Sequence, residues 1–411
     1  MYQTPFDIDF VRSQFPGLDT PWSLFDNAGG SQIAVQAIDR TTDYLRQTNV
    51  QHGASYELSR LAASRVEAGI EVVRQFLNVD ESCEIVAGSS ASQLLTNLSL
   101  AMRQWIRPGD EIIVTNLDHE ANITPWLRLA DYGAEIRFWK VNRDTLHLET
   151  EDLQQLLSPR TRLVCVTQTS NITGAIVSVR PIADLVHAAG AYLCVDGVAY
   201  APHRLPDMAA QDADIYVYSQ YKVYGPHVGM LYVRRALMEQ LGNINHYFHA
   251  ENLPYKLQPG GVVYELIAGI CGVGDYLELI SDTLGNEKTL PRRAKYQRAF
   301  DAVHAHEGRL NSIMISYLQS RDDVAIIGPA VSDPDVRVCT VSMSFRGMRA
   351  ADVTRRLEQS HIAVRNGNFY AARLVESLGI DDPGGLVRVS LAHYNSADEL
   401  DKLISVLDTC R

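Results

Sequence analysis

The chain has 411 residues, a length that predicts two domains. Of these residues 46% are hydrophobic and 21% charged, which is ordinary for a soluble globular protein and disfavours a disordered or membrane-embedded chain. Its formal net charge of -12 disfavours nucleic acid and anionic membranes as partners, because an acidic surface repels polyanions. No apolar run reaches the roughly 18 residues of a membrane span and the N-terminal sequence lacks signal-peptide features, so we expect a cytoplasmic protein.

From about residue 84 to 235, short β-type runs alternate with amphipathic helix-type stretches. The runs are EIVAGSS, EIIVTN, EIRFWKV, RLVCVTQTSN, YLCVDGV, DIYVYSQYK and VGMLYVR. This alternation predicts a mostly parallel, seven-stranded sheet with helices on both faces, an α/β fold. We expect it to form a large domain over residues 21–280.

A long helical pattern follows over residues 265–322, and the sequence then changes character. Strand-like and helix-like stretches alternate in RVCTVSMSF, RAADVTRRLEQS, HIAVRNG, LVRVSLAHY and ADELDKLISVLDTC. They predict a smaller α+β domain over residues 281–411, against which residues 1–20 are expected to pack. The six cysteines form no CxxC pair, so we expect free thiols and no metal site.

Two charged residues stand at the ends of apolar strands. Lys222 follows DIYVYS and precedes GPHVG, and Asp196 ends YLCVD. The carboxyl edge of an α/β sheet is where ligands bind, and a buried carboxylate needs a cation such as the pyridinium nitrogen of pyridoxal 5'-phosphate (PLP). Taken alone, the lysine is more typical of a solvated surface charge, and the aspartate is also compatible with a turn or a helix cap.

Three further polar sites follow other strands. Ser89 and Ser90 end one strand and open a helix, whose free N–H groups predict a phosphate site, although an ordinary serine cap fits the same pattern. His119 follows EIIVTN and could lie flat on an aromatic ring. Asn171 follows RLVCVTQTS and could bind a ring oxygen or a carboxylate, but either residue could instead be a satisfied polar group at a strand end.

The order of these motifs resembles the fold-type I PLP enzymes of the class V aminotransferase family, in particular its cysteine desulfurase/selenocysteine lyase-like members. The resemblance covers nearly the whole chain. It rests on FDNAGG, VQHGAS, AGSSAS, DHEANITPW, TSNITG, VDGVAYAPH, SQYKVYGPHVG and VRVSLAHYNSADELD.

The resemblance implies a role for each of these residues. It implies that Lys222 is the Schiff-base lysine and moves the α-proton, that Asp196 pairs with the pyridine nitrogen and that His119 stacks on the ring. It also implies which residues contact the cofactor and which contact the substrate. Phosphate and ring contacts are implied for Ser89, Ser90, Ser219, Tyr221 and Asn171, and substrate contacts for Arg388, Asn171, His52 and Arg365. A homodimer with active sites near the subunit interface is also implied.

One segment departs from the resemblance. Desulfurases of this group carry a late loop of the form RTGHHCA, whose cysteine receives sulfur as a persulfide. Here the corresponding residues 365–371 read RNGNFYA, with Tyr370 at the position of the cysteine. Because persulfide formation needs a thiolate, a standard desulfurase cycle is not expected.

We therefore expect a PLP enzyme that acts on a small amino acid as a cysteine desulfurase-like C–S lyase. A class V aminotransferase or an amino-acid epimerase is the alternative enzyme, and a non-catalytic scaffold is the non-enzyme alternative. Neither the substrate nor a sulfur-accepting partner protein can be read from the sequence.

Overall fold

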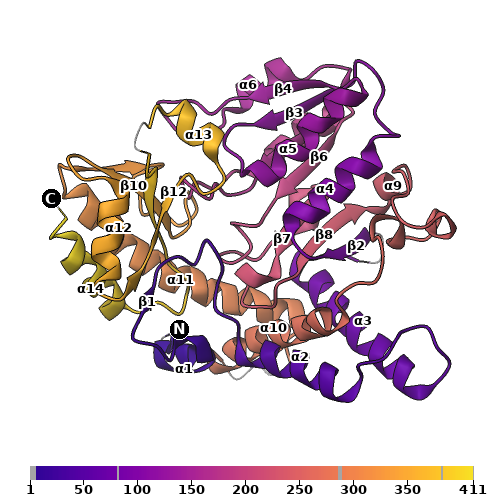
Figure 1. Ribbon diagram of the computed structural model, residues 1–411, viewed down its shortest axis with the longest axis horizontal. Coiled ribbons are helices and arrows are strands. Elements are labelled where there is room, and N and C mark those ends of the chain that lie inside the picture. Colours follow the sequence, from indigo (N-terminus) through magenta and orange to yellow (C-terminus); the bar gives the residue numbers. More distant parts are fainter. Residues whose placement is uncertain (1–5, 81–82, 286–288, 381–382, 411) are drawn as a thin grey trace.

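A computed structural model describes residues 6–80, 83–285, 289–380 and 383–410 of the chain. Figure 1 shows a large α/β part on the right, in purple and magenta, and a smaller part on the left, in orange and yellow. Long helices at the base of the molecule connect them. The predicted domains, residues 21–280 and 281–411, stay predictions.

The large part is built on a seven-stranded sheet in the order β2-β8-β7-β6-β5-β3-β4. The strands are β2 (Cys83–Gly88), β3 (Glu111–Thr115), β4 (Glu135–Trp139), β5 (Thr161–Thr167), β6 (Tyr192–Asp196), β7 (Ile215–Ser219) and β8 (Gly229–Arg234). β8 pairs antiparallel with β2 and β7, and the other pairs are parallel. The predicted mostly parallel seven-stranded sheet is confirmed.

Both faces of this sheet are buried under helices. In β7, Tyr216 and Tyr218 enter one core and Ile215 and Val217 the opposite core, as the two-residue period of a strand requires. The first core includes α2 (Val35–Gln47), α3 (Glu57–Leu77), α7 (Val179–Ala188), α8 (Met208–Gln211) and α10 (Tyr264–Thr283), and the second α4 (Ala91–Met102), α5 (Thr124–Leu127) and α9 (Arg235–Met238). Helix α6 (Thr150–Leu156) contacts β4. Burial of both faces explains why these strands are apolar throughout.

The small part contains an antiparallel four-stranded sheet in the order β12-β13-β10-β9. Its elements are α11 (Arg292–Gln319), β9 (Val324–Ile327), β10 (Thr340–Phe345), α12 (Ala350–Glu358), β12 (Arg365–Gly367), α13 (Ala372–Ser377), β13 (Leu386–Ser390) and α14 (Ala397–Leu407). A two-stranded parallel ladder joins β1 (Ser23–Leu24) to β11 (Ile362–Ala363). This ladder places the segment after β1 beside the small part although it lies far away in sequence (Figure 1).

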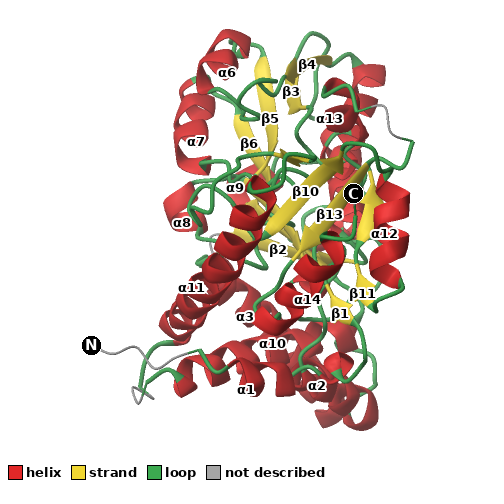
Figure 2. Ribbon diagram, turned by 90° about the vertical axis from the view of Figure 1, so that its left-hand side faces the viewer, coloured by secondary structure: helices red, strands yellow, loops and turns green. Residues whose placement is uncertain are grey.

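Helix α11 belongs to both parts. Tyr296 and Phe300 in its first half lie in a core of the large sheet, whereas Met314 and Leu318 in its second half lie in the core of the small sheet. Figure 2 shows the helix running from the level of α3 and α10 toward β10. One continuous helix thus crosses from core to core, whereas the predicted boundary between residues 280 and 281 falls inside α10 and stays a prediction.

The N-terminal helix α1 (Ile8–Ser13) contacts both parts of the molecule. Arg12 Nη1 donates to the Tyr394 carbonyl at 2.8 Å, while the Phe15 ring packs edge-on against Tyr276 at 5.2 Å. No helix within the described ranges is long and apolar enough to cross a membrane. The cytoplasmic location remains a prediction.

Candidate active site

The predicted site residues gather at one edge of the large sheet. β5, β6 and β7 run in parallel, with Thr167 opposite Asp196 and Asp196 opposite Val217, so their carboxyl ends meet there. The pairing of Ser219 with Gly229 brings the start of β8 to the same edge. A pocket opens at this edge, lined by Ser90, Ala91, Ser92, His119, Ala121, Thr167, Thr169, Asn171, Asp196, Val198, Ala199, Ser219, Tyr221 and Lys222.

Lys222 lies in the single turn of 3₁₀ helix that follows β7, Gln220–Lys222. The turn is fixed to the next strand because the N–H of Gln220 donates to the Val228 carbonyl at 2.9 Å. The side chain is buried, and burial together with the positive charge of Arg388 lowers the pKa of its amine to about 8, against the opposing pull of Asp196 and Asp26. A lysine with such a pKa is partly neutral near physiological pH and can act as a nucleophile or a base.

Asp196 ends β6 and is buried in the wall of the pocket. Its Oδ1 accepts a hydrogen bond from the N–H of Val198 at 2.9 Å. Burial raises the pKa of the carboxyl to about 6, while the Val198 N–H and the charge of Lys222 oppose that rise. A buried carboxylate is stabilised by a neighbouring cation, and a protonated pyridine nitrogen is such a cation.

His119 presents a neutral imidazole to the pocket. Its Nδ1 accepts a hydrogen bond from the N–H of Ala121 at 3.0 Å, which places the ring proton on Nε2. Burial, together with the positive charges of Lys222 and Arg388, lowers the pKa of the ring to about 4. A flat uncharged ring fixed in one tautomer is suited to stacking on a cationic heteroaromatic ring.

The end of the pocket near α4 has the chemistry of an anion site. Ser90 caps α4, its Oγ accepting from the Gln93 N–H at 3.1 Å, so the N–H groups of the first turn lie at the pocket. β8 passes so close that a Cβ on Gly229 would lie 2.5 Å from the carbonyl carbon of Ser90. Tyr221 contributes a ring that stacks on His227 at 5.0 Å with an interplanar angle of 4°.

Arg388 is buried beneath this pocket, on β13 of the small sheet. Its Nη2 donates to Asp26 Oδ1 at 3.0 Å, its Nη1 donates to the Asn171 carbonyl at 3.3 Å, and the Phe369 ring lies 3.9 Å from the guanidinium carbon. Its buried Nε has no hydrogen-bond partner among the described residues. One donor of the guanidinium is therefore free for a ligand.

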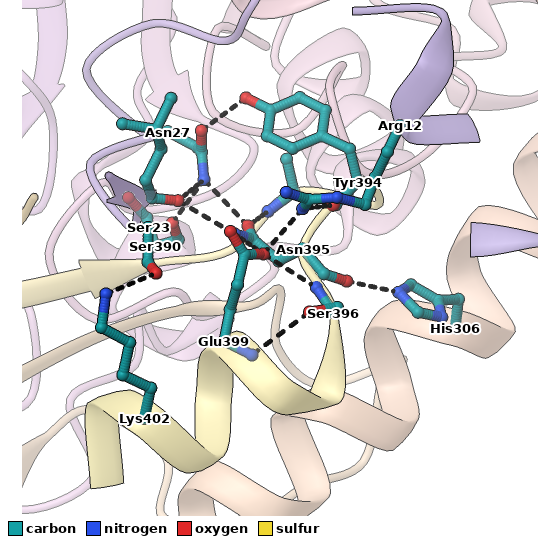
Figure 3. Close-up of polar contacts among 12 residues, drawn as sticks. Arg12, Ser23, Asn27, His306, Ser390, Tyr394, Asn395, Ser396, Glu399 and Lys402 are labelled. Carbon is teal, nitrogen blue, oxygen red and sulfur yellow. Dashed lines mark hydrogen bonds and ion pairs between the residues drawn. The ribbon is translucent and has the colours of Figure 1, made fainter. Parts of the chain in front are cut away.

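A polar network holds the loop that carries Asp26 (Figure 3). The Asn27 amide donates to the Ser390 carbonyl at 2.9 Å and to Asn395 Oδ1 at 3.1 Å, and the Tyr394 hydroxyl donates to Asn27 Oδ1. Because these partners come from the small part, the network fixes Asp26 relative to Arg388.

Besides Arg388, three predicted site residues lie outside the pocket. Ser89 directs its N–H and its hydroxyl at Gln93 Oε1, at 2.8 and 2.9 Å. The His52 ring stacks on Tyr264 at 3.7 Å, on the side of α2 and α10. Arg365 is solvent-exposed on β12, with its Nε 3.8 Å from Asp26 Oδ2. Of the predicted set, the pocket thus brings together Ser90, His119, Asn171, Asp196, Ser219, Tyr221 and Lys222, with Arg388 directly behind.

Tyr370 lies over His119, with ring centroids 5.3 Å apart and an interplanar angle of 38°. The loop is held in place by its backbone: the Tyr370 carbonyl accepts from the Glu120 N–H at 2.7 Å and the Phe369 carbonyl from the Asn171 amide at 2.8 Å. Both aromatic residues have positive φ angles, 51° and 59°. No cysteine lies among the residues that line the pocket.

Unpaired polar atoms in the pocket fit PLP. Thr169 Oγ1 and Asn171 Oδ1 are buried and have no hydrogen-bond partner within the described parts of the chain, and both residues line the pocket. Lys222 Nζ likewise has no hydrogen bond there, whereas Asp196 offers a carboxylate. An amine, a carboxylate, a flat ring and a helix N-terminus therefore surround one space, as the aldehyde, the ring nitrogen, the ring face and the phosphate of PLP require.

The fold and this pocket define an α/β enzyme of the PLP-dependent type. The chain belongs to the class V aminotransferase family, since the family model described as "Aminotransferase class-V" matches residues 23–403. The predicted family, the dependence on PLP and the enzyme class are thereby confirmed.

Several known proteins are similar over their full length. The aminotransferase-like protein FGM3 of Gibberella zeae is 40% identical, covering 99% of both chains, and the cysteine desulfurase-like protein ustD of Aspergillus flavus is 33% identical, covering 98% of this chain and 90% of the other. The cysteine desulfurase of Serratia proteamaculans is 30% identical over 98% of each chain. The crystal structure of the cysteine desulfurase CsdA of Escherichia coli, 24% identical over 99% of this chain and 98% of the other, has a TM-score of 0.82 and supports the fold.

Sequence reasoning missed Asp26, Thr169 and Phe369 as parts of the site. Asp26 lies in FDNAGG, which carries the resemblance, and Phe369 lies in RNGNFYA, which departs from it, but no local pattern indicates that both contact Arg388. Thr169 lies two positions before Asn171, and only its unpaired buried hydroxyl identifies it.

Proposed function

We propose that the protein is a PLP-dependent lyase, desulfurase-like in its cofactor site, which breaks a bond at Cα or Cβ of a small amino acid. A C–S bond is the first candidate. The observation that carries this proposal is a pocket with Lys222, Asp196 and His119 in its wall and no cysteine among its lining residues. We infer that the leaving group departs into solution rather than onto a protein thiol.

Each residue has a separate task in this proposal. When bound, PLP supplies an electron sink for the negative charge that develops at Cα. Lys222 Nζ removes the Cα proton and later returns a proton to the product, a task suited to an amine with a pKa of about 8. Asp196 holds a proton on the ring nitrogen, and His119 holds the ring plane.

Arg388 is proposed to bind the substrate carboxylate. Its Nε is buried and unpaired, and its Nη1 donates to the carbonyl of Asn171, whose Oδ1 is also unpaired. Because Asp26 and the Asn171 carbonyl already fix two corners of the guanidinium, binding a carboxylate requires little loss of side-chain freedom.

Transamination is the second candidate, favoured by the 40% identity to a protein named aminotransferase-like. A half-reaction separates the two. Purified protein loaded with PLP is mixed with single amino acids. A lasting pyridoxamine spectrum would indicate transamination, whereas release of sulfide or pyruvate with the starting spectrum restored would support the lyase.

The site itself is tested by locating the cofactor linkage. PLP is added, the protein is reduced with borohydride, and the labelled peptide is identified by mass spectrometry. We expect the label on Lys222 and its loss in Lys222→Ala. Lys256→Ala is the matched control, because Lys256 is also a buried lysine but lines a different pocket. A label on Lys256, or none at all, would contradict the proposed site.

We also propose that two copies associate and that His52 acts in the pocket of the second copy, because His52 lies outside the pocket of its own chain. Exposed apolar side chains on nearby helix α3, Leu58 and Leu61, are available for such an interface. Mixing inactive Lys222→Ala with a defective His52→Ala variant should restore activity, since one mixed site then has both residues. If His52 acts within its own chain, no activity returns.

A further inference from the structure

A second, smaller cavity lies next to Lys222. It shares only Lys222 and Ala199 with the cofactor pocket, and its other lining residues are Asn27, Ala28, Ser31, Pro202, His203, Thr340, Leu391 and Ala392. About 10 Å³ of it is open to water, which is room for about one water molecule. Lys222 and His203 thus line the same cavity.

His203 is paired with a buried carboxylate. Its Nδ1 lies 3.1 and 3.0 Å from the two carboxylate oxygens of Glu307, which comes from α11. Glu307 is 0% exposed and His203 is 5% exposed. Since the carboxylate can only accept here, Nδ1 carries a proton and Nε2 of a neutral ring is left with a lone pair. No hydrogen bond to that Nε2 is found in the ranges that the structure describes.

Two other groups lie close to Glu307, and one of them is the cation Arg204. Arg204 Nη1 lies 3.8 Å from Glu307 Oε2, beyond hydrogen-bond distance. The Cys339 thiol lies 3.9 Å from the same oxygen, and burial and Glu307 raise its pKa well above the ordinary value, so it stays neutral.

We propose that His203 and Glu307 form a proton relay for Lys222, an inference that rests on the proposed function. When Lys222 has taken the Cα proton, an Nζ–H bond breaks and the proton passes to the water in the cavity. That water gives one of its own protons to His203 Nε2, and Glu307 stabilises the resulting imidazolium. The return transfer restores the proton to Lys222.

The relay answers a physical difficulty of the site. Burial lowers the pKa of Lys222 to about 8, so its ammonium gives up a proton more readily than that of an exposed lysine, provided that an acceptor is within reach. A histidine oriented by a buried carboxylate is suited to accept it, because the carboxylate fixes the tautomer and stabilises the charge. His203 touches neither substrate nor cofactor and therefore acts through Lys222.

The coupling can be measured without cofactor or turnover. In cofactor-free protein labelled with ¹⁵N-histidine, we expect the ring-nitrogen chemical shifts of His203 at one fixed pH to differ between Lys222→Met and wild type, because the amine at the far side of the shared cavity is removed. His306 lies on the same helix as Glu307, bonds to the Asn395 carbonyl and should not respond. Unchanged chemical shifts of the His203 ring would overturn the relay.

Kinetics of the loaded enzyme provide the second test. In His203→Gln and Glu307→Gln we expect kcat to fall about 10²-fold with KM unchanged, and the solvent deuterium isotope effect on kcat to increase. His306→Gln is the matched control. If the variants change only stability or KM, the pair is a structural cross-link and the proposal is wrong.

A variant with both partners replaced guards against misfolding. His203→Phe/Glu307→Leu removes the two polar groups together, which a buried site tolerates better than the loss of one partner. It should fold and show the same kcat defect, and full activity in this variant would refute the relay. If wild type turns over no amino acid, the proposed function fails, whereas the ¹⁵N coupling can still be observed.

Discussion

The buried amine of Lys222 should make the cofactor-free protein less stable than a variant that lacks this charge. Burial lowers its pKa from 10.5 to about 8, so at pH 7 the chain folds with an ammonium in an unfavourable environment. At 1.36 kcal/mol for each pKa unit, this difference corresponds to about 3 kcal/mol. Lys222→Met keeps a similar shape without the charge, and we expect it to stabilise the cofactor-free protein by about this amount.

The direction in which this stability difference changes with pH follows from the lowered pKa of Lys222. Between pH 8 and 10.5 the unfolded chain holds a proton on this lysine that the folded chain has released, so wild-type stability rises with pH in that window. The advantage of Lys222→Met should therefore shrink as the pH rises from 8 toward 10.5.

Urea unfolding of both proteins at pH 7, 8.5 and 9.5, followed by circular dichroism, measures this difference. Lys140→Met is the control, because Lys140 is exposed and its replacement should change stability by less than about 0.5 kcal/mol. Equal stability of wild type and Lys222→Met at pH 7, or a gain that does not depend on pH, would refute the reasoning.

Three further variants test the surroundings of the pocket. Asp26→Asn removes the charged partner of buried Arg388 and should lower the free energy of unfolding by about 2 kcal/mol, measured by urea titration; no loss would show that the pair is weak. Gly229→Ala should lower the free energy of unfolding by about 1–3 kcal/mol and weaken PLP binding, because the added Cβ meets the backbone at the start of α4. Gly261→Ala should be neutral in the same assays, because its added Cβ has no atom nearer than 4.0 Å. Tyr370→Ala should weaken PLP binding several-fold in a fluorescence titration by freeing the imidazole beneath it, and Tyr370→Phe should not; equal affinities would contradict a positioning role for the ring.

The strand-end residues of the site could be read from the sequence because the signal is local. An apolar strand followed by a polar residue places that residue at the sheet edge, and parallel strands bring their carboxyl ends together. Lys222, Asp196, His119 and Asn171 follow this rule, and all four line one pocket.

The same rule did not predict which of two neighbouring serines faces the pocket. Ser89 and Ser90 are adjacent in a motif typical of a phosphate site, yet the turn into α4 directs Ser89 at Gln93 and leaves Ser90 at the pocket. A sequence pattern identifies the turn, whereas the hydrogen bonds of the helix cap decide which hydroxyl points inward.

Contacts between distant segments could not be predicted, because no local pattern encodes them. Asp26 and Arg388 are 362 positions apart, and they meet only because β1 pairs with β11 and the Asn27 network fixes the loop. His203 and Glu307, 104 positions apart, meet where α11 crosses from one core to the other.

The sequence by itself thus determined the sheet, the family and the lysine with its aspartate, since strand periodicity and motif order are properties of neighbouring residues. Tertiary structure alone decided the ionisation of these groups and their partners. The pKa of Lys222 depends on its burial and on the charges of Arg388, Asp196 and Asp26, which reach it from different parts of the chain. Burial and charge proximity exist only once the two parts of the molecule have packed together.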